Sequence, residues 1–373
     1  MPEQATLFLF IKGTAQSHIE KLVADAQLAA SLDTLERARA VTEIGTIVVA
    51  TANAEFAARA AVLGARIELD SPRDDFHWGK RLSALVDQYN AQTPLYIGGG
   101  SGALMSMDDW RAVAQRVVQT PNLVVTNNYY SCDFAAWSPG DALRRIEPPE
   151  LDNDLAYRLG ERAGLQVATL PKNAATQLDI DTPTDLLTIS FHPAVGKNLR
   201  AFLDSAQLDT MRAGRLLSLL GNRAVAALIA GRVSASMALL LERETRCQWR
   251  IYSEERGMRA SERQARGEAR SLLGYYLEQS NARGFFATLS RLADAAVLDS
   301  RVLFAHHRLR PTAIDRFSSD LLLVEQIGDP FVREFALAAR EASIPILLGG
   351  HSLVSGGMYA LVEASNAMRQ AMP

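Results

Sequence analysis

Two carboxylates, Asp179 and Asp181, are separated by one residue and followed directly by Thr182-Pro183. In an extended segment alternate side chains point to the same face, so both carboxylates are expected to face one site. Oxygen ligands of this kind suit Mg2+. Thr182 is a good N-cap residue and Pro183 suits the first helical turn, so a helix is predicted to begin there. The alternative is a loop aspartate that precedes an ordinary capped helix.

Glycine and polar residues follow three other apolar segments of the first half, where the carboxyl ends of strands are expected. The candidate residues are Lys12 after Leu7 to Ile11, Lys21 on the next helix, Gly98, Gly99, Gly100 and Ser101 after Leu95 to Ile97, and Asn127 and Asn128 after Leu123 to Thr126. Glycine amides can approach a phosphate closely, and lysine supplies a positive charge. These residues predict a phosphate site; the alternatives are a tight turn for the glycines and solvated positions for the lysines.

Segments typical of strands alternate with segments typical of helices up to about residue 195. This alternation predicts an α/β domain over residues 1–195, with a mostly parallel sheet sandwiched by helices, and ligands bind beyond the carboxyl ends of such strands. His192-Pro193 breaks the pattern. Residues 196–373 are predicted to form a mainly helical domain with a small sheet of strands at 248–252, 300–304 and 344–348. Asp152 is interpreted as part of an acidic cap on a helix that begins at Leu155.

The ends of those three strands predict a second candidate site in the second half. Its members are Glu254, His306, His351 and Ser352, which have general acid/base capacity. A metal site is the lesser alternative, because the adjacent His306 and His307 would point to opposite faces of a strand. The arginine-rich run 256–270 is interpreted as a solvated face with local ion pairs, since glutamates are interspersed in it.

Composition excludes several classes of protein. The chain has 373 residues, 48% of them hydrophobic and 22% charged, which is typical of a globular protein. A net charge of -3 gives no general reason to bind nucleic acid or a membrane surface. No run of about 18 apolar residues is present, and Cys132 and Cys247 form no metal or redox motif. We therefore expect a cytoplasmic protein; its oligomeric state is left open.

Residues 5 to 192, approximately, resemble the glycosyltransferase-A-like nucleotidyltransferases, in particular those that make molybdenum-cofactor dinucleotides or guanylylate 2-phospholactate. The segments that carry the resemblance are 9–22, 95–104 and 178–186, of which the last is the close match. The resemblance implies a sheet that binds a nucleoside triphosphate, with Mg2+ held at Asp179 and Asp181 and phosphates held by Lys12 and Lys21. A nucleotidyl group would pass to a phosphorylated or acidic acceptor near Asn127 and Asn128, with release of pyrophosphate.

One departure from the family concerns the metal. Where the family places an aspartate followed by Pro-Leu, this chain has Gly100-Ser101-Gly102-Ala103-Leu104. The ion would then depend on the remaining aspartates and on substrate oxygens, because Mg2+ tolerates few protein ligands. The alternatives are a non-catalytic nucleotide-binding or scaffold protein and a glycosyltransferase that uses a nucleotide-sugar. Residues 196–373 resemble no family that we identify.

Overall fold

The computed structural model describes residues 3–11, 15–70 and 76–371. The chain divides into two compact units. Unit 1 comprises residues 1–15, 24–179 and 196–202, and unit 2 comprises residues 16–23, 180–195 and 203–373. The chain crosses between the units more than once near the expected boundary at residue 195. It enters unit 2 at residue 180, returns to unit 1 for residues 196–202, and continues in unit 2 from residue 203.

Unit 1 is built on a seven-stranded sheet of order β3-β2-β1-β4-β6-β5-β7. Its strands are β1 (Ala5–Ile11), β2 (Ile44–Thr51), β3 (Arg66–Leu69), β4 (Pro94–Gly98), β5 (Leu123–Thr126), β6 (Phe134–Ser138) and β7 (Gln166–Thr169). Only β6 is antiparallel to its neighbours, β4 and β5. The start of β6 therefore lies at the same edge of the sheet as the carboxyl ends of the parallel strands.

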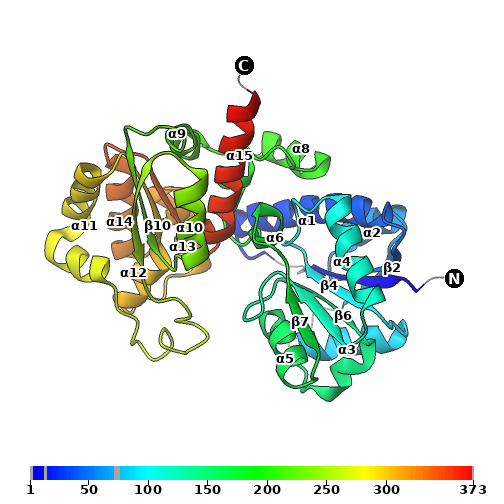
Figure 1. Cartoon of the computed structure of the whole chain (residues 1–373). Helices are drawn as coiled ribbons and strands as arrows, with labels where there is room; N and C mark the ends of the chain where they lie inside the picture. The colour runs from blue at the N-terminus through cyan, green and yellow to red at the C-terminus, as the bar shows by residue number, and fades with distance from the viewer. Residues whose placement is uncertain (1–2, 12–14, 71–75, 372–373) are drawn as a thin grey trace. The chain divides into compact units, whose positions relative to one another are not determined.

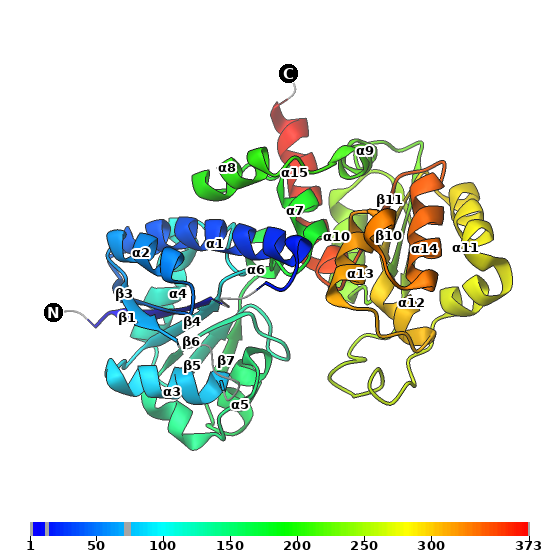
Figure 2. The ribbon, with the colours of Figure 1, turned by 180° about the vertical axis from the view of Figure 1, so that it is seen from behind.

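Helices cover both faces of this sheet (Figures 1 and 2). The main ones are α1 (His18–Arg39), α2 (Ala54–Val62), α3 (Trp78–Gln88), α4 (Met107–Gln119) and α5 (Leu155–Glu161). The other helical elements of unit 1 are the short α6 (Ala174–Gln177), the 3-10 turns η1 (Gly140–Arg145) and η2 (Asp152–Asp154), and the first part of α8 (Lys197–Ser205), which continues into unit 2 after residue 202. Successive residues of β1 point to opposite faces of the sheet, as a strand requires. Leu7 and Leu9 join the core under α1, α2 and α4, whereas Phe8 and Phe10 join the core under α3 and α5.

The start of α8 is fastened to unit 1 by one buried carboxylate. Asp33 accepts hydrogen bonds from the amide N–H groups of Asn198 and Leu199, both at 2.9 Å. It also accepts from Asn198 Nδ2 at 2.9 Å. Because the first amides of a helix lack intrahelical partners, an acidic acceptor at this position stabilises the helix start. These contacts explain why residues 196–202 belong with α1.

Unit 2 contains a four-stranded parallel sheet of order β11-β10-β8-β9. Its strands are β8 (Ala226–Gly231), β9 (Gln248–Ser253), β10 (Ala295–Asp299) and β11 (Ile346–Gly349). Its helical elements are α7 (Pro183–Ile189), α9 (Met211–Leu219), α10 (Ala235–Glu244), α11 (Leu272–Leu292), α12 (Ser300–His306), α13 (Ala313–Asp320), η3 (Val324–Gln326), α14 (Pro330–Glu341), η4 (Leu353–Gly357) and α15 (Met358–Ala371). The chain leaves β8 toward β9 and returns to the other side as β10, so the strand order reverses between β8 and β10.

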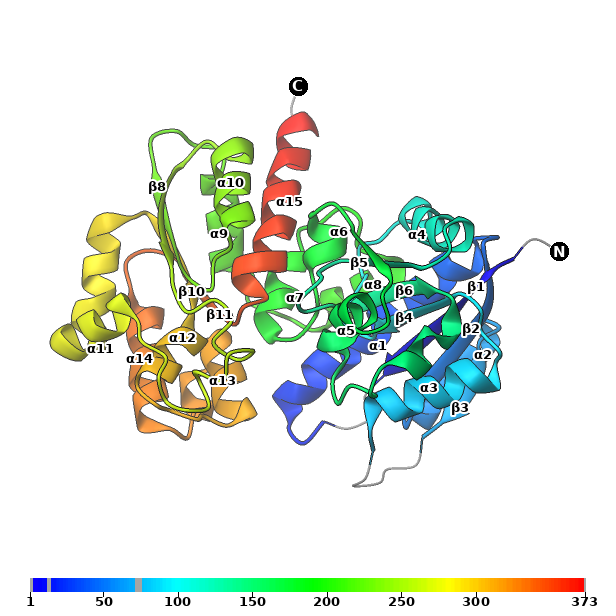
Figure 3. The same ribbon diagram turned by 60° about the horizontal axis from the view of Figure 1, so that its bottom comes forward.

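The two faces of the small sheet are covered by different helices (Figure 3). Phe285 and Phe286 of α11 pack with Phe335 of α14 in a core that includes Leu298 and Leu348 of the sheet. Figures 1 and 3 show α10 and α15 on the opposite face. Among the described helices, none is both long and apolar enough to cross a bilayer.

The predicted fold class is confirmed: a mostly parallel sheet between helices is followed by a helix-rich region with a small parallel sheet. Two local predictions were wrong. Residues 300–304 form the start of α12 rather than a strand, because the strand occupies Ala295–Asp299 directly before them. The expected strand at Asp179 is reduced to a single antiparallel bridge with Ser101.

Candidate functional site

The turn after β4 is the centre of the candidate site in unit 1. The amides of Gly98 and Gly99 continue the pairing of β4 with its neighbours: they donate to the carbonyls of Asp133, directly before β6 (3.3 Å), and of Phe10 in β1 (3.0 Å). The amide of Ser101 donates to the Gly98 carbonyl at 3.1 Å. Gly102 has a φ of +67°, and a Cβ there would lie 2.8 Å from Ile97 Cδ1. Gly98 and Gly99 thus extend the sheet and Ser101 closes the turn, so these three amide N–H groups donate to carbonyls; a phosphate site at this turn stays a prediction.

Ser101 holds the first of the two predicted metal ligands. Its Oγ donates to Asp179 Oδ1 at 3.0 Å, and the two residues pair through the antiparallel bridge. Ser101 is buried and Asp179 is half-buried. Ser101 thus orients a carboxylate that another segment of unit 1 supplies.

Two more carboxylates border the end of β4. Tyr96 Oη donates to Asp152 Oδ2 at 2.7 Å, and a Cβ at Gly98 would lie 3.7 Å from that oxygen. Burial, and next the charge of Asp152, raise the pKa of Tyr96 well above its usual value, so the phenol remains a donor. Asp133 Oδ2 accepts from Asn127 Nδ2 at 2.6 Å, and the Asp133 amide donates to Asn127 Oδ1 at 3.1 Å. This edge of the sheet therefore carries several carboxylate oxygens that could serve as metal ligands.

The structure shows what three residues on this edge contact. Asp152 is not a helix cap: the N-cap of α5 is Asp154, whose side chain makes no capping bond. Asp133 was missed, because it precedes β6, and nothing in the sequence indicated that an antiparallel strand begins there. Asn128 uses its Oδ1 to accept from the Tyr130 amide at 3.2 Å, which closes a local turn.

Two of the other predicted ligands, Lys21 and Asp181, belong to unit 2. Lys12 lies outside the described residues, and Lys21 is an exposed residue of α1 in the segment that belongs to unit 2. Asp181 also belongs to unit 2, where its amide donates to Asp185 Oδ2 at 3.0 Å. A single Mg2+ site made by Asp179 and Asp181 therefore stays a prediction. The donors around β4 are all oxygens, which suits Mg2+ if substrate oxygens complete its shell.

Asp185 organises the start of α7 in unit 2. Besides the Asp181 amide, its Oδ2 accepts from the Thr182 amide at 2.7 Å and from the Ser352 hydroxyl at 3.0 Å. Thr182 is the N-cap residue and Pro183 occupies the first turn, as predicted. Asp185 is fully buried, and its Oδ1 has no partner among the described residues. Burial, and next the charge of Asp181, raise its pKa to about 7.

In the predicted cluster of Glu254, His306, His351 and Ser352, the hydrogen bonds of the described residues link Glu254 with His306 through Ser271 and link Ser352 elsewhere. Glu254 accepts from the Ser271 hydroxyl at 2.5 Å and from the Leu272 amide at 2.7 Å, at the start of α11. His306 Nδ1 accepts from the Ser271 amide at 3.0 Å, so Glu254 and His306 meet at this residue. Ser352 instead contacts Asp185.

His351 lies among charged groups at the carboxyl edge of the small sheet. Its side chain is accessible to solvent, yet it is surrounded closely enough that desolvation, followed by the charge of Arg232, lowers its pKa to about 4. The ring is therefore neutral near pH 7. It shows no contact with Glu254 or His306 that would complete the predicted acid/base cluster.

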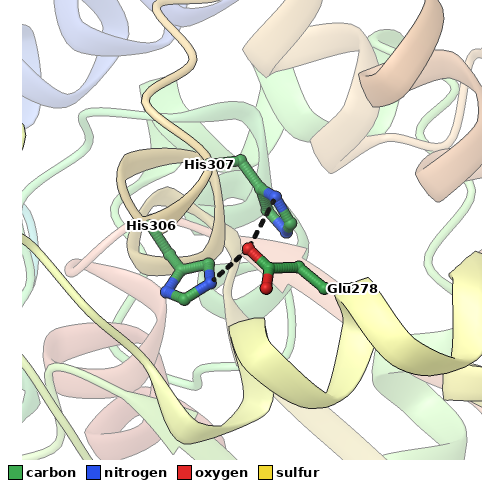
Figure 4. A group of neighbouring side chains, drawn as sticks. All are labelled: Glu278, His306 and His307. Atoms are coloured by element: carbon green, nitrogen blue, oxygen red, sulfur yellow. Dashed lines mark hydrogen bonds and ion pairs between the residues drawn. The ribbon is translucent and has the colours of Figure 1, made fainter.

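Glu278, His306 and His307 form a compact group (Figure 4). Glu278 Oε1 lies 3.1 Å from His306 Nε2 and 3.9 Å from His307 Nδ1. His306 and His307 lie at the end of helix α12 and not on a strand, so the expectation that their side chains point to opposite faces does not apply. Because His306 Nδ1 accepts from a backbone N–H, the neutral ring carries its proton on Nε2 and donates it to Glu278. A metal would need that nitrogen's lone pair, so the hydrogen bonds favour a structural role.

Two buried arginine–aspartate pairs follow β8 and β10. Arg232 Nε and Nη2 donate to Asp299 at 2.6 and 3.1 Å. Arg301 Nη1 and Nη2 donate to Asp320 at 2.7 and 2.6 Å. Burial alone would lower the pKa of Arg301, but the Asp320 carboxylate raises it, so the pair is ionised. Buried charges require such partners.

Comparisons with known proteins give weak similarities. No family model and no curated protein matches the sequence. CMP:2-keto-3-deoxy-manno-octonic acid synthetase complexed with CTP is 15% identical over 49% of this chain and 95% of its own, with a TM-score of 0.36. A cytidylyltransferase from Leptospira borgpetersenii is 14% identical over 54% of this chain and 93% of its own, with a TM-score of 0.40. Rv0371c from Mycobacterium tuberculosis is 16% identical over 55% of this chain and 100% of its own, with a TM-score of 0.37. Similarities this weak establish neither a family nor a substrate.

Proposed function

We propose that unit 1 binds a nucleoside triphosphate with Mg2+ beyond the end of β4 and transfers its nucleotidyl group to a small phosphorylated or acidic acceptor. The observation that carries the proposal is the Ser101–Asp179 contact, which holds a carboxylate at the carboxyl edge of the central strands. In sheets of this kind, ligands bind at that edge. The nearby carboxylates of Asp133 and Asp152 add oxygen donors.

The proposed reaction is a displacement at the α-phosphorus. An acceptor oxygen forms a bond to that phosphorus, the bond to the bridging oxygen breaks, and pyrophosphate leaves with the bonding electron pair. The acceptor's proton passes to solvent or to a carboxylate. A bound Mg2+ would offset the charge of the phosphates. Asp179 would hold the ion and Ser101 would orient Asp179, whereas the parts assigned to Asp181, Lys12 and Lys21 rest on the sequence alone.

Thermal unfolding in the presence of ligands tests the class of substrate. We expect at least one nucleoside triphosphate to raise the melting temperature of the purified chain when Mg2+ is present. At a ligand concentration of about 100 times Kd, the stabilisation is about 2.7 kcal/mol, which corresponds to roughly 5–10 °C for a unit of this size. The panel should include the four common nucleoside triphosphates and several nucleotide-sugars, each with Mg2+ and with EDTA.

The same panel separates the alternatives. If only nucleotide-sugars stabilise the protein, the result favours a glycosyltransferase and contradicts nucleotidyl transfer. Absence of stabilisation by every nucleotide would contradict the proposal and favour a scaffold. Pyrophosphate release from the stabilising triphosphate, on addition of small phosphorylated acceptors, would then support transfer.

A further inference from the structure

Unit 2 contains a cavity with a volume of about 870 Å³ that arginines dominate. The arginines that line it are Arg259, Arg266, Arg301, Arg308, Arg310 and Arg316. The remaining lining residues include Phe304, Leu309 and Pro311, which contribute apolar surface, and no described acidic residue lines the cavity. The cavity lies within the size range of small-molecule sites.

Most of these arginines form no ion pair with a carboxylate of the described residues. Arg301 is paired with Asp320, and Arg266 lies 3.0 Å from Glu268. Within the described part of the chain, the other four arginines form no ion pair. The guanidinium groups of Arg310 and Arg316 donate instead to the carbonyls of Ala265 (3.3 Å) and Pro311 (2.7 Å). Carbonyl acceptors orient a guanidinium but leave its charge in place.

The positive charges act on one another. Desolvation, followed by the charges of Arg301 and Arg259, lowers the pKa of Arg316. Desolvation, followed by the charge of Arg232, lowers the pKa of Arg259, although the charges of Asp181 and Asp299 act in the opposite direction. Like charges gathered in this way destabilise the protein unless an anion binds between them. Such clusters are typical of functional sites.

The cavity also has the position expected of a ligand site. Arg301 and Phe304 belong to α12, which follows β10 directly, and Arg259 and Arg266 lie in the segment that follows β9. These are carboxyl ends of parallel strands, next to the reversal of strand order between β8 and β10. Ligands of open parallel sheets bind at this kind of position.

We propose that this cavity binds a small molecule that carries at least two phosphate groups. Planar guanidinium groups match phosphate oxygens through paired hydrogen bonds, and several arginines can share one polyphosphate. The apolar surface contributed by Phe304, Leu309 and Pro311 is available to the rest of the molecule. A single-stranded nucleic acid would instead require a continuous basic groove with exposed aromatic residues. The proposal is independent of nucleotidyl transfer by unit 1.

Calorimetric titration with tripolyphosphate tests the proposal, with EDTA present so that no Mg2+ supports binding at unit 1. We expect the full chain to bind one tripolyphosphate. The variant Arg259→Gln/Arg308→Gln should raise Kd about tenfold or more, because two charge-assisted contacts are lost. Both side chains are exposed, so the substitution should leave the fold intact.

The matched control is Arg223→Gln/Arg243→Gln, which removes two exposed arginines of unit 2 that do not line the cavity. Its Kd should stay within about twofold of the parent value, since the same net charge is removed at a distance. The proposal is overturned if tripolyphosphate does not bind, or if both double variants weaken binding equally. Citrate serves as a second probe: binding as tight as that of tripolyphosphate would overturn the assignment to phosphate.

Discussion

The substitution Asp299→Ala is expected to lower the free energy of unfolding of unit 2 by about 3–5 kcal/mol, because it leaves a buried guanidinium without its carboxylate. Arg232 is 8% exposed and Asp299 2%. The two side chains are joined by two hydrogen bonds, and the Arg232 amide adds a third, at 3.4 Å, to the same carboxylate. Gly231 permits this approach, since a Cβ there would lie 2.3 Å from Asp299 Cβ.

Denaturant unfolding at pH 7 measures this loss, with Asp204→Ala as the control because Asp204 is exposed in the same unit. Burial alone would raise the pKa of Asp299, but the charge of Arg232 outweighs it and the pKa is lowered from 3.8. A lowered folded-state pKa means that the stabilisation is present above the usual pKa and is lost as the pH falls through the folded value. The difference between parent and variant should therefore narrow below about pH 4. A variant as stable as the control at pH 7 would contradict the buried ion pair.

The substitution Asp185→Asn is expected to remove a large pH dependence of stability. The pKa of Asp185 is raised from 3.8 to about 7. Protonation therefore favours the folded state: this contribution is complete below the unfolded pKa, near 4, and is lost as the pH rises through about 7. The total loss is on the order of 4 kcal/mol. Asparagine does not ionise, so the variant should keep its stability over this range.

Unfolding of the parent and of Asp185→Asn at pH 5 and at pH 8 measures this effect. The parent should lose stability between the two values, whereas the variant should change little and should exceed the parent at pH 8. Asp204→Asn is the control and should follow the parent at both values. An equal pH dependence in parent and Asp185→Asn would show that the buried carboxylate is charged throughout.

Local chemistry predicted the α7 start well, because N-cap and proline preferences act within a few residues. It predicted β10 poorly. Ala295 to Leu298 form a short apolar run directly after a long helix, and such a run fits a helix or a strand equally. The choice of strand depends on pairing with β8 and β11, which are distant in sequence.

The alternation of strands and helices correctly predicted that the Ser101 turn lies at the carboxyl edge of the sheet. The alternation could not reveal Asp133, which precedes β6. Because β6 is antiparallel to β4, its amino end, and not its carboxyl end, lies at that edge. The arginine run 256–270 was interpreted as solvated, and Arg263 does pair with Glu255 at 2.8 Å. Arg259 forms no ion pair with a described residue. It lines the cavity together with Arg308 and Arg316, which come from another segment. Only the tertiary structure brings these charges together.

Binding of the stabilising nucleoside triphosphate to the parent and to Asp179→Ala, measured by calorimetry with Mg2+ and with EDTA, tests the central claim most directly. Asp141→Ala, which removes an exposed carboxylate of unit 1, is the control. We expect Mg2+ to lower the Kd of the triphosphate about tenfold or more for the parent and for the control, and to leave the Kd of Asp179→Ala nearly unchanged. An Asp179→Ala variant with the affinity and Mg2+ dependence of the parent would contradict this claim.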